Sequence, residues 1–192
     1  MRLLSGSEAL QYANKNPKTV DETLFGFFRE TMKLSDAEIA DRIDEYRQQF
    51  FDALKENLGV TCLDSQNSDN FIGQAIIVKI KEPQSGFKSD KVIYPVNEIR
   101  RACVATEYRG QGIYPKLIRP KIIELGEANN AGSVITVTKQ EVIKRYSREQ
   151  GWAEYGEAET ALMYGYDPYR IDELPPIDKD ECKGYTMLVK PR

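Results

Sequence analysis

The sequence predicts an α/β (α+β) fold with helices flanking a central sheet, and three observations carry this prediction. A predicted β-strand runs through a glycine-spaced turn directly into a helix at residues 104–118. Strand-like and helix-like segments then alternate along the chain. Finally, 192 residues with 41% apolar and 30% charged side chains are typical of one globular chain. We therefore expect a single domain over residues 1–192.

The N-terminal third is predicted to be mainly helical. Residues 3–13 fit either a short strand or a helix, and residues 20–33 fit a helix with an aromatic face. Ser35-Asp-Ala-Glu38 is a capping box that opens a second helix, and Gly59 is expected to end it. The apolar faces of these two helices, expected to pack on the sheet, comprise Leu24, Phe27, Phe28 and Met32, then Ile39, Ile43, Tyr46, Phe50, Leu54 and Leu58.

The rest of the chain alternates strands with two more helices. One helix follows the glycine turn, and a second spans residues 139–150 and ends at Gly151. Loops are expected at residues 81–91 and 167–182, which are rich in proline or acidic residues. The predicted strands are residues 60–63, 71–80, 92–106, 133–138, 152–166 (broken near Gly156) and 183–190.

Composition excludes several kinds of chemistry. The chain has no histidine, which removes Ser-His-Asp and Cys-His nucleophiles and the commonest metal ligand, so we expect no metal site. Three widely spaced cysteines and no signal-peptide core indicate reduced thiols and a cytoplasmic protein. A net charge of −3 and no long apolar run give no reason to expect nucleic acid or a membrane as partner.

The glycine turn has the features of an anion site. Gly110 and Gly112 allow backbone conformations that other residues avoid and let a ligand approach closely. The first N–H groups of the helix that follows lack intrahelical partners and carry partial positive charge. A strand, such a turn and a helix N-terminus together favour a phosphate or pyrophosphate.

Two motifs resemble those of the GNAT superfamily of N-acetyltransferases. Arg109-Gly-Gln-Gly112 is similar to its acyl-CoA signature, although Tyr114 stands where a small residue is usual and Pro115 supplies no N–H. Residues 146–152 (Tyr-Ser-Arg-Glu-Gln-Gly-Trp) resemble the second motif, a tyrosine-bearing helix that ends at Gly-Phe or Gly-Trp. The resemblance covers residues 71–152, and it implies a mixed, mostly antiparallel sheet.

The resemblance also implies an acetyl-CoA site. Backbone groups of the strand before the turn would pair with the pantetheine arm, and the N–H of Ala102 would polarise the thioester carbonyl. If the strand alternates without a bulge, Glu98, Ala102 and Val104 share one side and Cys103 faces the core. The implied CoA-binding residues are Ala102, Cys103, Val104, Arg109, Gly110, Gln111, Gly112, Ile113 and Tyr114.

The same resemblance suggests catalytic groups. Glu98 lies eleven positions before Arg109, the spacing of a general-base glutamate in the histone-acetylating branch, although it could merely pair with Arg100 or Arg101. The acid for the leaving thiolate falls on Tyr146 or Ser147, which cannot both face the sulfur because one helical residue turns a side chain by about 100°. A packed Tyr146 and an exposed Ser147 without any catalytic role is the alternative.

These residues favour an N-acetyltransferase that moves the acetyl group of acetyl-CoA to a primary amine of a small molecule or a protein. Glu98-Ile-Arg-Arg101 also resembles the Glu-x-x-Arg element of acyl-homoserine-lactone and acyl-amino-acid synthases, which use longer acyl chains. A third possibility is a non-catalytic CoA-binding module. The acceptor and the oligomeric state stay open, and a homodimer is one option.

Overall fold

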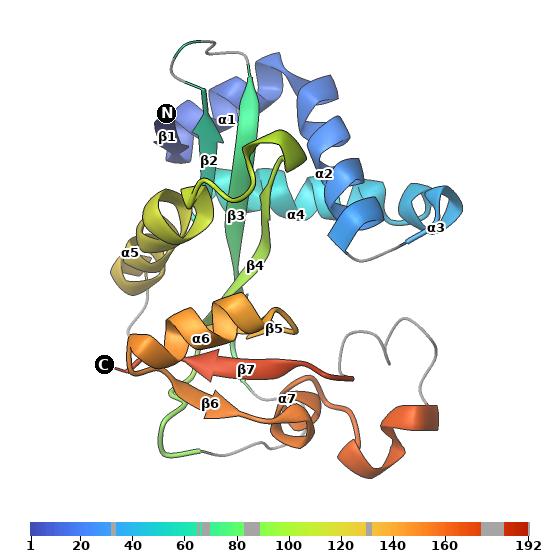
Figure 1. Cartoon of the computed structure of the whole chain (residues 1–192), viewed down its shortest axis with the longest axis vertical. Coiled ribbons are helices and arrows are strands. Elements are labelled where there is room, and N and C mark those ends of the chain that lie inside the picture. The colour runs from blue at the N-terminus through green and yellow to red at the C-terminus, as the bar shows by residue number, and fades with distance from the viewer. Residues whose placement is uncertain are drawn as a thin grey trace. The chain divides into compact units, whose positions relative to one another are not determined.

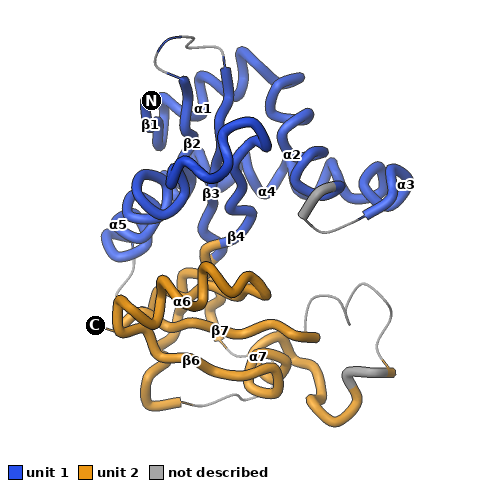
Figure 2. Tube along the Cα trace, viewed as in Figure 1, with its two compact units in different colours: residues 1–78, 100–129 blue, residues 79–99, 130–192 orange. Residues whose placement is uncertain are grey.

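The chain divides into two compact units that share one β-strand. The structure, a computed structural model, describes all residues except 32–33, 65, 67–69, 83–88, 130–131, 174–182 and 192. Unit 1 comprises residues 1–78 and 100–129, and unit 2 comprises residues 79–99 and 130–192 (Figure 2). Strand β4 (Val96–Val104) passes from one unit into the other, so its two halves have different surroundings.

Seven strands form one sheet in the order β1-β2-β3-β4-β5-β7-β6 (Figure 1). The pairs β1–β2, β2–β3, β5–β7 and β6–β7 are antiparallel, whereas β4 and β5 run parallel. This confirms the predicted mixed, mostly antiparallel sheet flanked by helices. The other strands are β1 (Arg2–Ser5), β2 (Gly59–Leu63), β3 (Phe71–Ile80), β5 (Val134–Thr138), β6 (Ala153–Tyr155) and β7 (Thr186–Val189).

The helices follow the predicted order with some additions. Residues 3–13 contain both expected alternatives, because a strand gives way to a helix after Ser5. The α-helices are α1 (Gly6–Lys15), α2 (Pro17–Thr31), α3 (Asp36–Ala40), α4 (Ile43–Lys55), α5 (Arg119–Asn129), α6 (Glu141–Glu149) and α7 (Glu157–Met163). Shorter helical segments are η1 (Thr106–Tyr108), the π-helix η2 (Tyr114–Ile118) and η3 (Pro168–Glu173).

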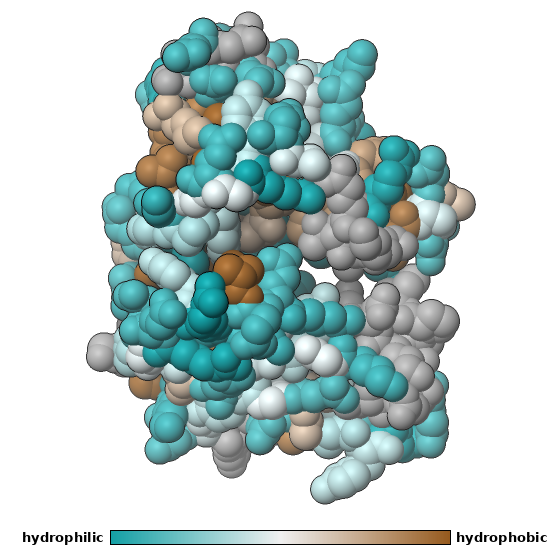
Figure 3. All heavy atoms as spheres, in the orientation of Figure 1, coloured by the Kyte–Doolittle hydropathy of each residue, from teal (hydrophilic) through white to brown (hydrophobic). Residues whose placement is uncertain are grey.

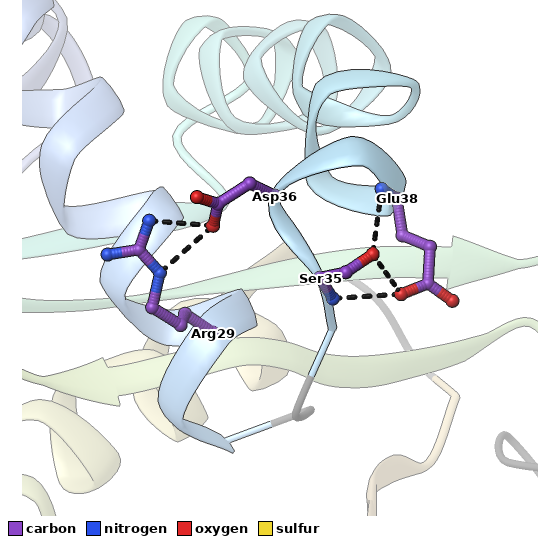
Figure 4. A network of polar contacts seen from close by, with 4 residues as sticks. All are labelled: Arg29, Ser35, Asp36 and Glu38. Carbon is purple, nitrogen blue, oxygen red and sulfur yellow. Dashed lines mark hydrogen bonds and ion pairs between the residues drawn. The ribbon is translucent and has the colours of Figure 1, made fainter.

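The capping box at the start of α3 is confirmed. The N–H of Glu38 donates to Ser35 Oγ at 3.4 Å, and the N–H of Ser35 donates to Glu38 Oε2 at 2.8 Å (Figure 4). The Ser35 hydroxyl also donates to that carboxylate, which lowers the pKa of Glu38. Arg29 from α2 reaches Asp36 in the same first turn at 2.7 Å. The start of α3 is therefore stabilised by the local capping box, with an added ion pair from α2.

The end of α4 differs from the prediction. The left-handed residue is Asn57, with φ 57°, whose N–H donates to Leu54 O at 3.2 Å while the N–H of Leu58 donates to Ala53 O at 2.7 Å. That pair of bonds is a Schellman cap, and asparagine tolerates its left-handed position. Gly59 instead lies in β2, where a Cβ would come 2.6 Å from a Leu54 methyl. Close packing of helix on strand, rather than a helix end, requires this glycine.

The predicted apolar faces form the core of unit 1. The whole second set, from Ile39 to Leu58, is buried, as are Leu24 and Phe28, whereas Met32 lies outside the described residues. Phe28 and Tyr46 stack with ring centroids 4.3 Å apart. The guanidinium of Arg101, a β4 residue with φ 54°, lies 3.8 Å from the Tyr46 ring centroid. The aromatic pair therefore holds a left-handed residue inside a strand.

Unit 2 corrects the prediction of a long strand over residues 152–166. Only Ala153–Tyr155 is extended, and Gly156 is the N-cap of α7. Aromatic residues at both ends suggested a strand, but Glu, Ala, Leu and Met between them are strong helix formers. Helix α7 buries Met163 against a cluster from β4, β5, β7 and the segment before β4, which comprises Val92, Val96, Ile135, Met187 and Val189.

The surface drawn in Figure 3 is mainly hydrophilic, with hydrophobic residues in small separate areas. Among the described residues, the large apolar side chains that are exposed are Met1, Ile93, Val142 and Tyr169. No described helix is both long and apolar enough to cross a lipid bilayer.

Candidate functional site

The glycine turn in unit 1 leaves backbone donors unused. Gly110 and Gly112 adopt φ angles of 78° and 75°, which only glycine adopts readily. The N–H groups of residues 110–112 donate to no described backbone carbonyl, in contrast to that of Arg109, which donates to Thr106 O at 3.2 Å. Three consecutive amides at the entrance of a helix can therefore bind an anion.

Side chains on both sides anchor this turn. Arg109 Nε donates to Val104 O at 2.9 Å, which closes the segment back onto the end of β4. The Tyr108 hydroxyl donates to Asp64 Oδ2 at 3.3 Å and accepts from Asn70 Nδ2 at 2.5 Å. Arg109, expected to bind CoA, thus has a structural hydrogen bond through one of its nitrogens. The turn is held in place before any ligand arrives.

Lys116 is a candidate binding residue that the sequence reasoning missed. Its N–H donates to Gly112 O at 2.9 Å, and its side chain folds back over the turn. A Cβ at Gly112 would lie 3.0 Å from Lys116 Cε and 3.4 Å from Nζ. A lysine in the first helical turn, four residues after the last glycine, is the signal that could have identified it. An ammonium group and three free amides at one place favour a polyanionic ligand.

The helix after the turn begins as a π-helix, and Pro120 explains why. Pro120 has no N–H and would clash with the carbonyl four residues earlier in an α-helix. In η2 the N–H of Arg119 donates instead to Tyr114 O, five residues back, which widens the turn. The Tyr114 side chain also bonds the buried Arg119 guanidinium, and burial raises the pKa of this tyrosine to about 12. The Tyr114 side chain therefore supports the helix through Arg119.

The end of β4 carries the three residues expected beside a thioester. Cys103 is buried as predicted, and burial raises the pKa of its thiol to about 12. Ala102 and Val104 are half-buried. The left-handed φ of Arg101 interrupts the extended backbone, so the alternation predicted from Glu98 to Val104 does not run unbroken. The condition attached to that prediction, a strand without a bulge, is not met.

Glu98 lies in the half of β4 that belongs to unit 2. Its side chain is only 3% exposed, and its backbone pairs with Ile135 of β5. The Tyr164 hydroxyl donates to Glu98 Oε1 at 2.5 Å. The sequence reasoning missed Tyr164, because it assigned this residue to a strand instead of the C-cap of α7. The fold thus gives the candidate base a neutral hydrogen-bond donor.

The second motif ends in a closed cap. Gly151, with φ 73°, donates its N–H to Arg148 O at 2.9 Å, and Trp152 donates to Ser147 O at 3.0 Å. Ser147 is fully buried, and its hydroxyl donates to Ile143 O at 2.8 Å. Tyr146 is half-buried. Ser147 is therefore not exposed, and its hydroxyl is used within the helix. Of the two residues, Tyr146 is the better candidate acid.

Two other features bear on the predicted site. Residues 174–182 of the acidic loop lie outside the described part, so Cys182 and most of the loop's prolines do as well. Within the described ranges, no three Cys, Asp or Glu side chains form a group that could hold a metal ion.

Comparison with known proteins gives the fold its class. No protein-family profile matches the sequence, and no curated protein matches it. Solved structures do: an acetyltransferase of the GNAT family from Staphylococcus aureus is 10% identical with a TM-score of 0.54, covering 99% of this chain and 98% of that one. A ribosomal-protein-alanine N-acetyltransferase from Brucella melitensis is 17% identical with a TM-score of 0.53, covering 81% and 86%.

The chain therefore has the fold of the GNAT acetyltransferases, as the two sequence motifs suggested. An acetyltransferase from Streptococcus agalactiae matches over its length as well, at 13% identity, a TM-score of 0.54, and coverage of 100% and 98%. N-acetylglutamate synthase from Neisseria gonorrhoeae, solved with coenzyme A and N-acetyl-glutamate, matches at 12% identity and a TM-score of 0.50, covering 99% of this chain and 34% of that one.

Proposed function

We propose that the protein is an N-acetyltransferase that transfers the acetyl group of acetyl-CoA to a primary amine. The observation that carries this proposal is the turn at residues 109–114, where three free amides and Lys116 meet at a helix entrance. In this proposal the turn binds the pyrophosphate of CoA. The fold supports it, because a neighbour of the same fold was solved with coenzyme A.

The reaction would proceed by direct attack. The amine nitrogen adds to the thioester carbonyl, the N–H of Ala102 stabilises the oxyanion, and the C–S bond breaks to release the CoA thiolate. Glu98 takes the proton that the amine loses, and Tyr146 is the candidate that protonates the sulfur. The buried Cys103, whose thiol keeps its proton at neutral pH, makes an acyl-cysteine intermediate unfavourable.

The acceptor is proposed only as a primary amine. Neighbours that share the fold include one named for a ribosomal protein and one solved with an acetylated amino acid, so the fold alone selects neither class. The long-chain acyl transferase and the non-catalytic CoA-binding module are the readings that the binding test must separate from this one.

Calorimetry with acetyl-CoA, CoA and a long-chain acyl-CoA tests the proposal. We expect micromolar acetyl-CoA binding that Gly112→Trp abolishes, because the indole would displace Lys116 and fill the turn. Gly110→Ala is the milder comparison, since a Cβ there meets nothing within 4 Å and costs only about 1–2 kcal/mol of backbone strain. Gly184→Ala, at a left-handed glycine outside the turn, is the matched control.

The outcomes are distinct. A marked preference for the long chain would promote the acyl-synthase reading, and binding without release of free CoA thiol across an amine screen would favour the binding module. Failure to bind any of the three ligands would remove the proposal, because the turn would then be only a connection between β4 and α5.

A further inference from the structure

The side chain of Tyr164 reaches from the end of α7 to the carboxylate of Glu98 in β4. Glu98 is nearly fully buried, and the hydroxyl donates to its Oε1 at 2.5 Å. We propose that Tyr164 is a positioning residue for acyl transfer, which orients the Glu98 carboxylate toward the amine proton. This inference rests on the proposed role of Glu98 as the general base.

The backbone around Tyr164 fixes where its hydroxyl lies. Its N–H donates to Ala161 O at 3.1 Å and Thr160 O at 3.3 Å, at the last turn of α7. Beyond it, Gly165 adopts φ 85° and donates to Leu162 O, while Tyr166 donates to Ala161 O at 3.0 Å. This is a closed Schellman cap, which leaves the tyrosine little backbone freedom. The neighbouring Met163 is fully buried in the core of unit 2, and the Tyr164 ring packs against the same cluster.

A buried carboxylate needs donors, and the type of donor decides what it can do. An Arg or Lys partner would compensate the negative charge and make the carboxylate a weaker base. A phenol donates a hydrogen bond without adding a positive charge, so it fixes the plane of the carboxylate and leaves its charge. Tyr164 is therefore suited to holding a base in one orientation, which general-base catalysis requires.

Strand β4 lies between β3 and β5, and β3 carries the ionisable residue Lys79 near its end. The β5 residues that pair with this part of β4 are Val134, Ile135 and Thr136, none of which is ionisable. From the end of α7, the Tyr164 hydroxyl reaches the Glu98 carboxylate. On β4, the nearest charged residues in sequence are Arg100 and Arg101. Removal of the tyrosine hydroxyl should thus change one identified hydrogen bond to the carboxylate.

The test is Tyr164→Phe, which keeps the ring and removes only the hydroxyl, in the amine acetylation assay. We expect kcat to fall about tenfold, the effect of losing one hydrogen bond to a charged group. The acidic limb of the pH profile of kcat should move to higher pH, because the ionised carboxylate has lost a donor. Acetyl-CoA affinity, measured by calorimetry, should stay unchanged.

Tyr155→Phe is the matched control. Tyr155 is also half-buried in unit 2, packs against the same core cluster, and its hydroxyl is hydrogen-bonded to that of Ser89. This variant removes a comparable hydroxyl away from Glu98, so its pH profile should coincide with that of the wild type. A purely structural effect would lower the melting temperature and kcat of both variants and leave both profiles in place.

Glu98→Gln separates the inference from the proposed function. We expect this variant to lose most of its activity and the acidic limb, while still binding acetyl-CoA. If Glu98→Gln behaves so but Tyr164→Phe keeps both the wild-type rate and profile, the positioning role is wrong and the base stands. If Glu98→Gln retains rate and limb, Glu98 is not the base and the role of Tyr164 fails with it.

Discussion

Two turns of this protein contain left-handed glycines, but they differ in whether their backbone N–H groups are hydrogen-bonded. At residues 109–114, before a helix, the N–H groups of residues 110–112 donate to no described backbone carbonyl. At Gly151, after a helix, the N–H groups of Gly151 and Trp152 both bond to carbonyls of α6. The φ angles, 75–78° and 73°, are almost the same. A positive φ alone therefore does not indicate a site; the destination of the neighbouring N–H groups does.

The largest expected effect is the loss of acetyl-CoA affinity when Lys116, which lies over the glycine turn, is replaced. Lys116→Met should weaken acetyl-CoA binding at least tenfold, because charge-assisted hydrogen bonds contribute about 1.5–3 kcal/mol. Calorimetry at two salt concentrations measures it, and the loss should shrink at higher salt. Lys121→Met is the control, since that lysine of α5 pairs with Glu124 at 2.6 Å. Equal losses in both variants would show a general charge effect and no specific site at the turn.

Substitution in the turn at Gly151 should change the stability of the protein rather than its affinity for acetyl-CoA. Gly151→Ala should lower the free energy of unfolding by about 1–2 kcal/mol, the cost of a left-handed alanine, because a Cβ there meets nothing within 4 Å. Urea denaturation measures this change. Acetyl-CoA affinity at temperatures where the variant is folded should equal that of the wild type. If Gly151→Ala kept its stability but lost acetyl-CoA binding, the turn at Gly151 would have a binding role, contrary to this comparison.

Cys103 should make the free energy of unfolding depend on pH in the alkaline range. Burial raises the pKa of its thiol to about 12, so the unfolded chain loses this proton near pH 9 while the folded chain keeps it. The stabilisation is fully present below pH 9 and is lost as the pH rises toward 12, at up to about 1.4 kcal/mol per pH unit. Urea midpoints of wild type and Cys103→Ala between pH 8 and 11 should therefore converge. Parallel curves would mean that the thiol titrates alike in both states.

The smallest expected change in the free energy of unfolding is at Asn57, in the turn that ends α4. Asn57→Gly should alter the free energy of unfolding by less than about 0.5 kcal/mol, since both residues accept a left-handed φ, whereas Asn57→Ala should cost about 1 kcal/mol. Urea denaturation of the two variants side by side checks this. A larger loss in the glycine variant would show that the asparagine side chain, and not its backbone, matters at this cap.

Local patterns were enough for much of the fold. Helical periodicity identified the buried face of α4, residue composition identified the strand at residues 71–80, and the Ser-x-x-Glu motif identified the Ser35 capping box. The errors arose where tertiary packing decides. Gly59 is needed because Leu54 packs on it, and the π-helix depends on how Pro120 is accommodated. Neither requirement can be read from residue spacing.

The candidate site was predicted unevenly for the same reason. The glycine turn carries a contiguous signature, so its residues could be named in advance. Tyr164 lies 66 residues from Glu98, and a pairing over that separation follows only from the fold. Lys116 could have been found, because its spacing from Gly112 places it over the turn once a helix is assumed. The roles of Glu98 and Tyr146 remain predictions.

The contact between Arg101 and Tyr46 joins two residues that are synthesised at different times. Tyr46 precedes Arg101 by 55 residues, so at 5–20 residues per second it is synthesised roughly 3–11 s earlier. Phe28 and Tyr46, on helices that pack together, can meet during that interval. The left-handed residue of β4 then enters the nascent protein after its aromatic partners. The order of synthesis therefore allows the aromatic pair to form first and β4 to pack against it afterwards.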